Sequence, residues 1–129
     1  MKRSFLEPYT WAVIVETNRQ LCLPKAALHK PTSDGYQETR QLWESLHRTP
    51  MTLTEAADLC RRCHRLAPFC NFNGNTFVAV IRLVIARMNL PPDRTAVLRS
   101  LAGHIVAGTA TPNEIKHFQG VLDQLGGDE

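Results

Sequence analysis

The chain is 129 residues long, carries a formal net charge of +3 and is 43% hydrophobic. This length fits one domain, and the apolar content is near the globular average, which excludes a low-complexity or disordered chain. The longest apolar run near the start, residues 11–15, is far too short to span a bilayer. Glu7 and Pro8 interrupt the apolar core that a signal peptide would need. We therefore expect a cytoplasmic protein with no membrane partner.

The first part of the chain is rich in strand-forming residues. Residues 9–15 are aromatic and β-branched, and residues 16–19 have the composition of a turn before a short return segment at residues 20–23. A hairpin of this size is marginal alone, so it would pack against other elements. The pattern predicts a short strand or hairpin within a lead-in that covers residues 1–31.

Helix start and stop signals dominate from residue 32 onward. The spacing of a capping box, in which a polar cap is answered three residues later by Glu or Gln, occurs at Asp34–Gln37, Thr52–Glu55 and Thr111–Glu114. Prolines and glycines close most of the segments between these signals. Between residues 77 and 88 apolar residues go almost all the way round, which is typical of a buried central helix. A buried strand is the alternative there, but the length favours a helix.

Together these patterns predict a mainly α-helical fold. We expect a compact bundle of about five helices over residues 32–127, in one domain that includes residues 1–129. Connections between the predicted helices are short, which favours antiparallel neighbours.

The charge distribution is the main indication of function. Between residues 59 and 112 the only acidic residue is Asp93. The same stretch contains seven arginines and no lysine: Arg61, Arg62, Arg65, Arg82, Arg87, Arg94 and Arg99. Arginine's planar fork suits phosphate oxygens, and clustered cations on one face are the electrostatic footprint of nucleic-acid binding. The pattern predicts a non-enzymatic accessory protein that binds nucleic acid or a nucleoprotein assembly through these arginines.

Two other interpretations use the same residues. An arginine-rich face can dock to an acidic protein surface, and the very apolar segment at residues 77–88 can support a homo-oligomer. The arginines can also form a solvated face with internal pairs, for example Asp58 with Arg62 at i, i+4.

The cysteines raise the question of a metal. Cys60 and Cys63 have the spacing of two zinc ligands, Cys70 follows, and His64, Cys22 or His29 would supply a fourth. A second Cys-x-x-Cys pair is missing, and Cys60 and Cys63 fall on the apolar side of the predicted helix. Core packing is therefore the preferred interpretation, and no metal or cofactor is predicted.

Catalytic patterns are also missing. No nucleophile, histidine and carboxylate occur in a recognised order, and the central helices almost lack the carboxylates that general acids require. We therefore expect no enzymatic activity, with a metal-stabilised or catalytic domain built on the cysteines as the third hypothesis.

Overall fold

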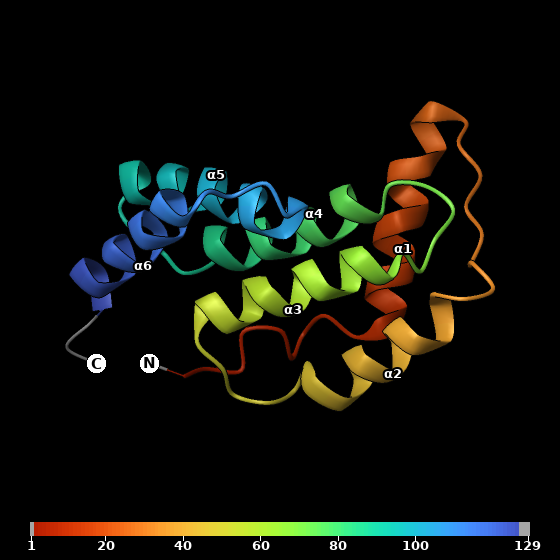
Figure 1. Ribbon diagram of the computed structural model, residues 1–129, viewed down its shortest axis with the longest axis horizontal. Helices are drawn as coiled ribbons and strands as arrows, with labels where there is room; N and C mark the ends of the chain where they lie inside the picture. Colours follow the sequence, from red (N-terminus) through yellow and green to blue (C-terminus); the bar gives the residue numbers. More distant parts are fainter. Residues whose placement is uncertain (1, 127–129) are drawn as a thin grey trace.

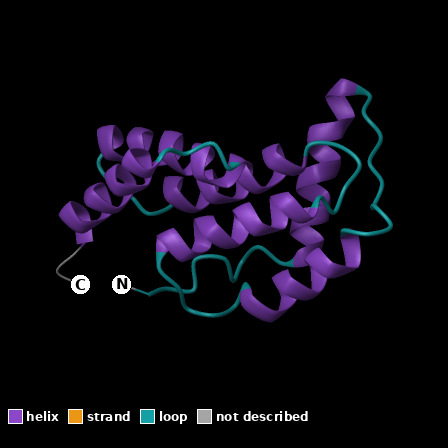
Figure 2. Cartoon of the chain, in the orientation of Figure 1, coloured by secondary structure: helices purple, strands orange, loops and turns teal. Residues whose placement is uncertain are grey.

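The computed structural model describes residues 2–126, which form a mainly helical bundle (Figures 1 and 2). Six α-helices occur within these residues: α1 (Trp11–Cys22), α2 (Tyr36–Leu46), α3 (Leu53–Leu66), α4 (Asn73–Ala86), α5 (Pro92–Ala107) and α6 (Pro112–Gly126). A 3-10 turn, η1 (Leu23–Lys25), extends α1. The mainly helical prediction is confirmed, with one helix more than the five expected.

The predicted N-terminal strand is wrong. Residues 11–22 form α1, and the return segment falls at the end of this helix and in η1. The Thr10 hydroxyl accepts a hydrogen bond from the Val13 amide at 3.3 Å and caps the helix. Trp11, Ile14 and Asn18 recur on one buried face. Helical spacing of buried groups thus outweighs the modest strand preference of β-branched residues. Within residues 2–126, β-type pairing is limited to two isolated bridges, between Arg3 and Met51 and between Pro31 and Phe69.

Two of the three predicted capping boxes are confirmed. Thr52 and Glu55 exchange hydrogen bonds at 2.8 and 3.1 Å, and the pair at the start of α6 does the same at 2.9 and 3.1 Å. The box predicted at Asp34 does not form, because α2 begins one residue later with Gly35 at its N-cap. The Gly35 amide instead donates to the Thr32 hydroxyl at 3.2 Å.

Helix α4 lies at the centre of the bundle, in contact with α1, α3 and α5. The prediction of a buried central helix is confirmed for the side chains of Phe77, Val80, Ile81, Val84 and Ile85. It is wrong for Leu83, which is 44% exposed. Helix α5 also packs on α3 and α6, so α3, α4 and α5 form the mutually packed centre of the fold.

A buried polar group joins α1 to the loop that precedes α4. The Asn18 side chain is fully buried and donates to the Asn71 carbonyl at 2.7 Å and to the Thr76 hydroxyl at 3.0 Å. Its oxygen lies 2.8 Å from His29 Nδ1. A buried amide is costly unless its partners are present, so this network fixes the register between α1 and α4.

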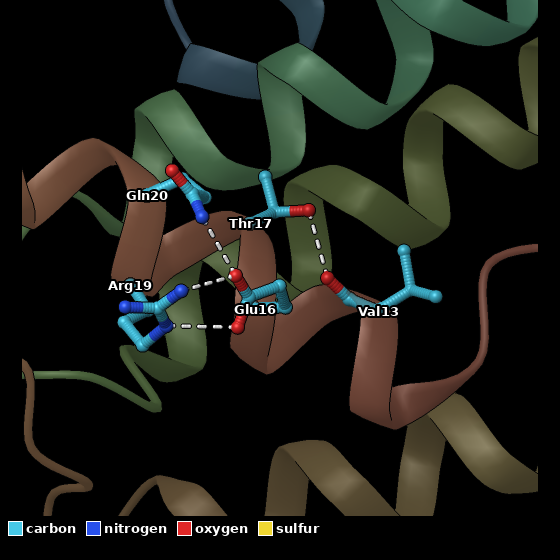
Figure 3. Close-up of polar contacts among 5 residues, drawn as sticks. All are labelled: Val13, Glu16, Thr17, Arg19 and Gln20. Carbon is cyan, nitrogen blue, oxygen red and sulfur yellow. Dashed lines mark hydrogen bonds and ion pairs between the residues drawn. The ribbon is translucent and has the colours of Figure 1, made fainter.

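The exposed side of α1 is held by local contacts (Figure 3). The Glu16 carboxylate accepts from Arg19 Nε and Nη2 at 2.8 and 2.7 Å, and from Gln20 at 2.8 Å. On the same helix, the Thr17 hydroxyl donates to the carbonyl of Val13, one turn before it, at 2.7 Å. The positive charge of Arg19 is therefore neutralised within its own helix.

Candidate nucleic-acid interface

Helix α3 presents two unpaired arginines to solvent. Its buried side carries Leu53, Ala56, Cys60 and similar residues, so the charged residues fall on the opposite arc. Arg62 and Arg65 are exposed, and among residues 2–126 neither side chain has a hydrogen bond or an ion pair. An arginine without an internal acid keeps its full donor set for an external anion.

Arg61 differs from its two neighbours on α3. Its Nη2 lies 2.8 Å and its Nε 3.0 Å from the same oxygen of Asp58. The predicted pair between Asp58 and Arg62 is therefore wrong by one position, because the i, i+3 geometry with Arg61 is the one adopted. The Asp58 carboxylate reduces the charge that Arg61 offers to a ligand.

Arg82 and Arg99 come from the two adjacent helices α4 and α5. The Nε of Arg82 donates to the main-chain carbonyl of Arg99 at 3.2 Å. A Cβ placed on Gly103 would lie only 2.5 Å from Arg82 Nη2, so the guanidinium rests against the glycine backbone of α5. Arg82 is half-buried in this position, while the Arg99 side chain is exposed.

Arg82 also lines a groove of about 750 Å³ beside the first turn of α4, here called the α4 groove. The His64 imidazole forms another wall, and its Nδ1 lies 2.9 Å from the Val106 carbonyl. Because a carbonyl only accepts, Nδ1 carries the hydrogen and Nε2 is turned toward Gly74, 3.2 Å from the place a Cβ would occupy. These contacts bring together the end of α3, the start of α4 and the end of α5.

The start of α4 contributes positive potential to this groove. The helix has no acidic residue in its first turn and no side-chain cap on its N-terminal amides. Such a helix end has a partial positive charge. The Asn73 side chain, in the first turn of α4, accepts from the Phe69 amide at 2.9 Å and donates to the Phe69 carbonyl at 2.7 Å.

Arg87 and Arg94 lie apart from the α4 groove. Arg87 caps the C-terminal end of α4, about 20 Å from its first turn at 1.5 Å per residue. It donates to the Tyr9 hydroxyl at 3.2 Å and lies 5.9 Å from the Tyr9 ring centroid. Arg94 donates to Gln124 at 2.8 Å and lies 3.6 Å from Asp93. Both arginines therefore make their contacts within the protein, away from the α4 groove.

The structure therefore does not gather the seven predicted arginines into one surface. Arg62 and Arg65 on α3 have no partner among the described residues. The Arg82 side chain reaches from α4 to the main chain of Arg99 on α5. Arg61, Arg87 and Arg94 bind side chains elsewhere in the protein. Sequence analysis also missed the α4 groove, whose signal was the lack of any acid at the start of an otherwise apolar helix.

The cysteines are mostly core residues. Cys60 and Cys63 are fully buried, which confirms the packing interpretation for this pair. Burial raises the pKa of both thiols, to about 12 for Cys63. Cys70 is exposed and lies outside this cluster. Within residues 2–126, no three histidine, cysteine or acidic side chains come together as metal ligands would.

Comparison with protein-family models, curated proteins and solved structures finds no match to this chain. In the described part of the chain, every helix is too short or too polar to cross a membrane.

Proposed function

We propose that this protein is a non-enzymatic accessory protein of the cytoplasm that binds the phosphate backbone of nucleic acid, alone or in a nucleoprotein assembly. The observation that supports the proposal most is the pair Arg62 and Arg65, exposed on α3 with no internal partner among residues 2–126. Guanidinium groups bind phosphate through charge-assisted, often bidentate hydrogen bonds.

In this proposal the α4 groove continues the phosphate-binding surface beyond α3, whose residue His64 lines the groove. A backbone that follows α3 toward its C-terminal end would reach Arg82 and the positive end of α4 at the groove. Arg99 would add a cation on the neighbouring helix. The contacts available are all to phosphate, so little base specificity is expected.

The groove's lining favours binding over catalysis. It contains one histidine and one arginine but no carboxylate, serine or cysteine, so it has neither a nucleophile nor the second acid-base group that hydrolytic sites use. Charge neutralisation is therefore the mechanism that these residues support.

Fluorescence anisotropy with labelled duplex DNA, single-stranded DNA and RNA tests the proposal. Binding should weaken linearly in the logarithm of salt concentration, with a slope of about −0.9 per duplex phosphate contacted. The double variant Arg62→Gln/Arg65→Gln should lose affinity and reduce that slope by about 1.8, since two contacts are lost.

The matched control is Arg19→Gln/Arg40→Gln, which removes the same charge from two exposed arginines that are already paired with glutamates. This control should keep nearly all of the affinity and slope. The proposal is wrong if no nucleic acid binds at low salt, or if both double variants lose affinity equally. Binding of an acidic polypeptide in place of nucleic acid would assign the surface to a protein partner.

A further inference from the structure

The segment after α1 exposes two leucines. Leu23 and Leu28 are 65% and 60% exposed, more than any other large hydrophobic residue described. They belong to residues 23–30, here called the α1 tip, which projects beyond the rest of the bundle (Figure 1). The tip also carries exposed Lys25 and Lys30 and no acidic residue. Leu23 and Leu28 therefore alternate with Lys25 and Lys30 along an exposed, projecting segment.

The conformation of the tip is fixed by hydrogen bonds. The amides of Ala26 and Ala27 donate to the Leu23 and Cys22 carbonyls at 3.2 and 3.1 Å, with Ala26 left-handed at φ 49°. This is the pattern of a Schellman helix end, usually made with glycine. The Leu28 carbonyl accepts from the Asn71 side chain at 3.0 Å. The leucines are therefore presented to solvent by an ordered turn that costs strain to hold.

A matching apolar groove lies at the other end of the molecule. This terminal groove has a volume of about 660 Å³, within the range of about 300–1,000 Å³ that binds sizeable apolar groups. Its apolar lining comprises Phe5, Leu53, Met88, Leu90, Leu122 and Leu125. Two carboxylates, Glu55 and Asp123, and the guanidinium of Arg3 stand around it. Glu55 is already engaged by the Thr52 amide and lies 4.0 Å from Lys2, whereas the exposed Asp123 has no hydrogen bond or ion pair within the described residues.

One copy cannot fill its own groove with its own tip. The tip extends from the end of α1, whereas the groove lies between the start of α3 and the end of α6, at the opposite end of the bundle (Figure 1). The two surfaces can meet only between separate molecules.

We propose that the α1 tip of one molecule inserts Leu23 and Leu28 into the terminal groove of a second copy, with Lys25 or Lys30 next to Asp123. The exposed leucines would enter an apolar groove, and the lysines next to them in the chain would oppose the rim carboxylate. Because the two surfaces differ, the contact is heterologous and can repeat from molecule to molecule. A contact built on one loop is small, so the association is weak and depends on concentration.

Sedimentation velocity from about 10 µM to about 1 mM, the range in which weak contacts dissociate, tests the proposal. The wild-type mass should rise with concentration beyond a dimer. Leu23→Ser/Leu28→Ser should stay monomeric, whereas the control Leu83→Ser, which removes an exposed leucine from α4, should associate like the wild type. A wild-type protein that remains monomeric throughout, or a tip variant that still associates, overturns the proposal.

A mixing experiment separates this contact from general stickiness. Asp123→Lys changes an exposed rim residue and should also prevent self-association. Mixed with the tip variant, it supplies an intact tip while the tip variant supplies an intact groove. The mixture should therefore form one-to-one dimers and nothing larger. Failure of the mixture to associate, with both variants folded by circular dichroism, contradicts the tip-in-groove pairing, and neither result depends on nucleic-acid binding.

Discussion

The guanidinium of Arg82 on α4 rests against Gly103 on α5, where a Cβ would lie 2.5 Å from Nη2. Only a glycine lets the arginine take this position and donate to the Arg99 carbonyl at 3.2 Å. The absence of a side chain at Gly103 therefore determines where the Arg82 guanidinium lies beside the α4 groove.

Gly103→Ala should therefore move Arg82 without unfolding the protein. The nearest atoms are the far end of a flexible side chain, which can swing away, and alanine gains about 1 kcal/mol of helix propensity over glycine. We expect the NMR chemical shift of the Arg82 Nε–H group to move to the value of a solvent-exposed arginine. The melting temperature should change little. An unchanged signal would show that the contact with Gly103 does not hold the side chain. Gly120→Ala serves as the control, since nothing lies within 4 Å of its Cβ position.

Gly35 meets main-chain atoms, and its substitution should be far more damaging. A Cβ there would lie 2.0 Å from the Leu66 carbonyl oxygen and 2.5 Å from that of Ala67, so the start of α2 would have to leave the end of α3. We expect Gly35→Ala to lower the free energy of unfolding by about 2–3 kcal/mol, the upper part of the range for overpacked sites. Urea denaturation measures this loss. In the same assay Gly120→Ala should raise the stability by up to about 1 kcal/mol, and equal behaviour of the two variants would contradict the close approach.

Local signals explain which parts of this fold could be predicted from sequence. The Thr52–Glu55 box is a contact between neighbours in the chain, so its pattern is visible without the rest of the fold. Helix α1 depends instead on burial of Trp11 and Ile14 and on Asn18, whose partner Thr76 lies 58 residues away. No local propensity reveals such a partner, so the strand-forming composition misled the prediction.

The same limit applies to the candidate interface. Helical spacing correctly placed Cys60 and Cys63 on the buried side of α3, while Arg62 and Arg65 are exposed. It could not show that Arg87 binds Tyr9, a residue 78 positions earlier. Tertiary contacts engage Arg87 and Arg94, whereas Arg61 pairs with Asp58 on its own helix, so three of the seven arginines have side-chain partners within the protein.

Thiol reactivity gives a third test of the structure. Burial raises the pKa of Cys22, Cys60 and Cys63, so their reactive thiolates are scarce near neutral pH, whereas the Cys70 residue is exposed. An aromatic disulfide reagent at pH 8 should therefore modify one thiol quickly and the others only as the protein opens. Cys70→Ser should abolish the fast phase and Cys60→Ser should leave it intact. Two or more fast thiols in the native protein would contradict the buried positions of the other cysteines.

The caps of α3 and α6 should titrate differently from ordinary carboxylates. The pKa of Glu114 is lowered, first by the hydrogen bond from the Thr111 amide and then by His104, whose Nδ1 lies 2.7 Å from its carboxylate. The pKa of Glu55 is lowered chiefly by the hydrogen bond from the Thr52 amide, with smaller contributions from the Thr52 side chain and from Lys2, and without any histidine. Contacts with Arg19 and Gln20 lower the pKa of Glu16 to about 2.

A folded-state pKa below the unfolded value stabilises the protein above the unfolded pKa, and this contribution is lost as the pH falls through the folded value. Carboxyl carbon NMR between about pH 1 and pH 6 should therefore show Glu16 titrating near pH 2, and Glu55 and Glu114 below the ordinary glutamate value of about 4.3. His104→Ala should raise the pKa of Glu114 and leave that of Glu55 unchanged, because the imidazole of His104 contacts the carboxylate of Glu114. Equal shifts at both residues would mean that His104 acts through the fold as a whole. An ordinary pKa for Glu114 in the wild-type protein would mean that the cap of α6 is not formed in solution.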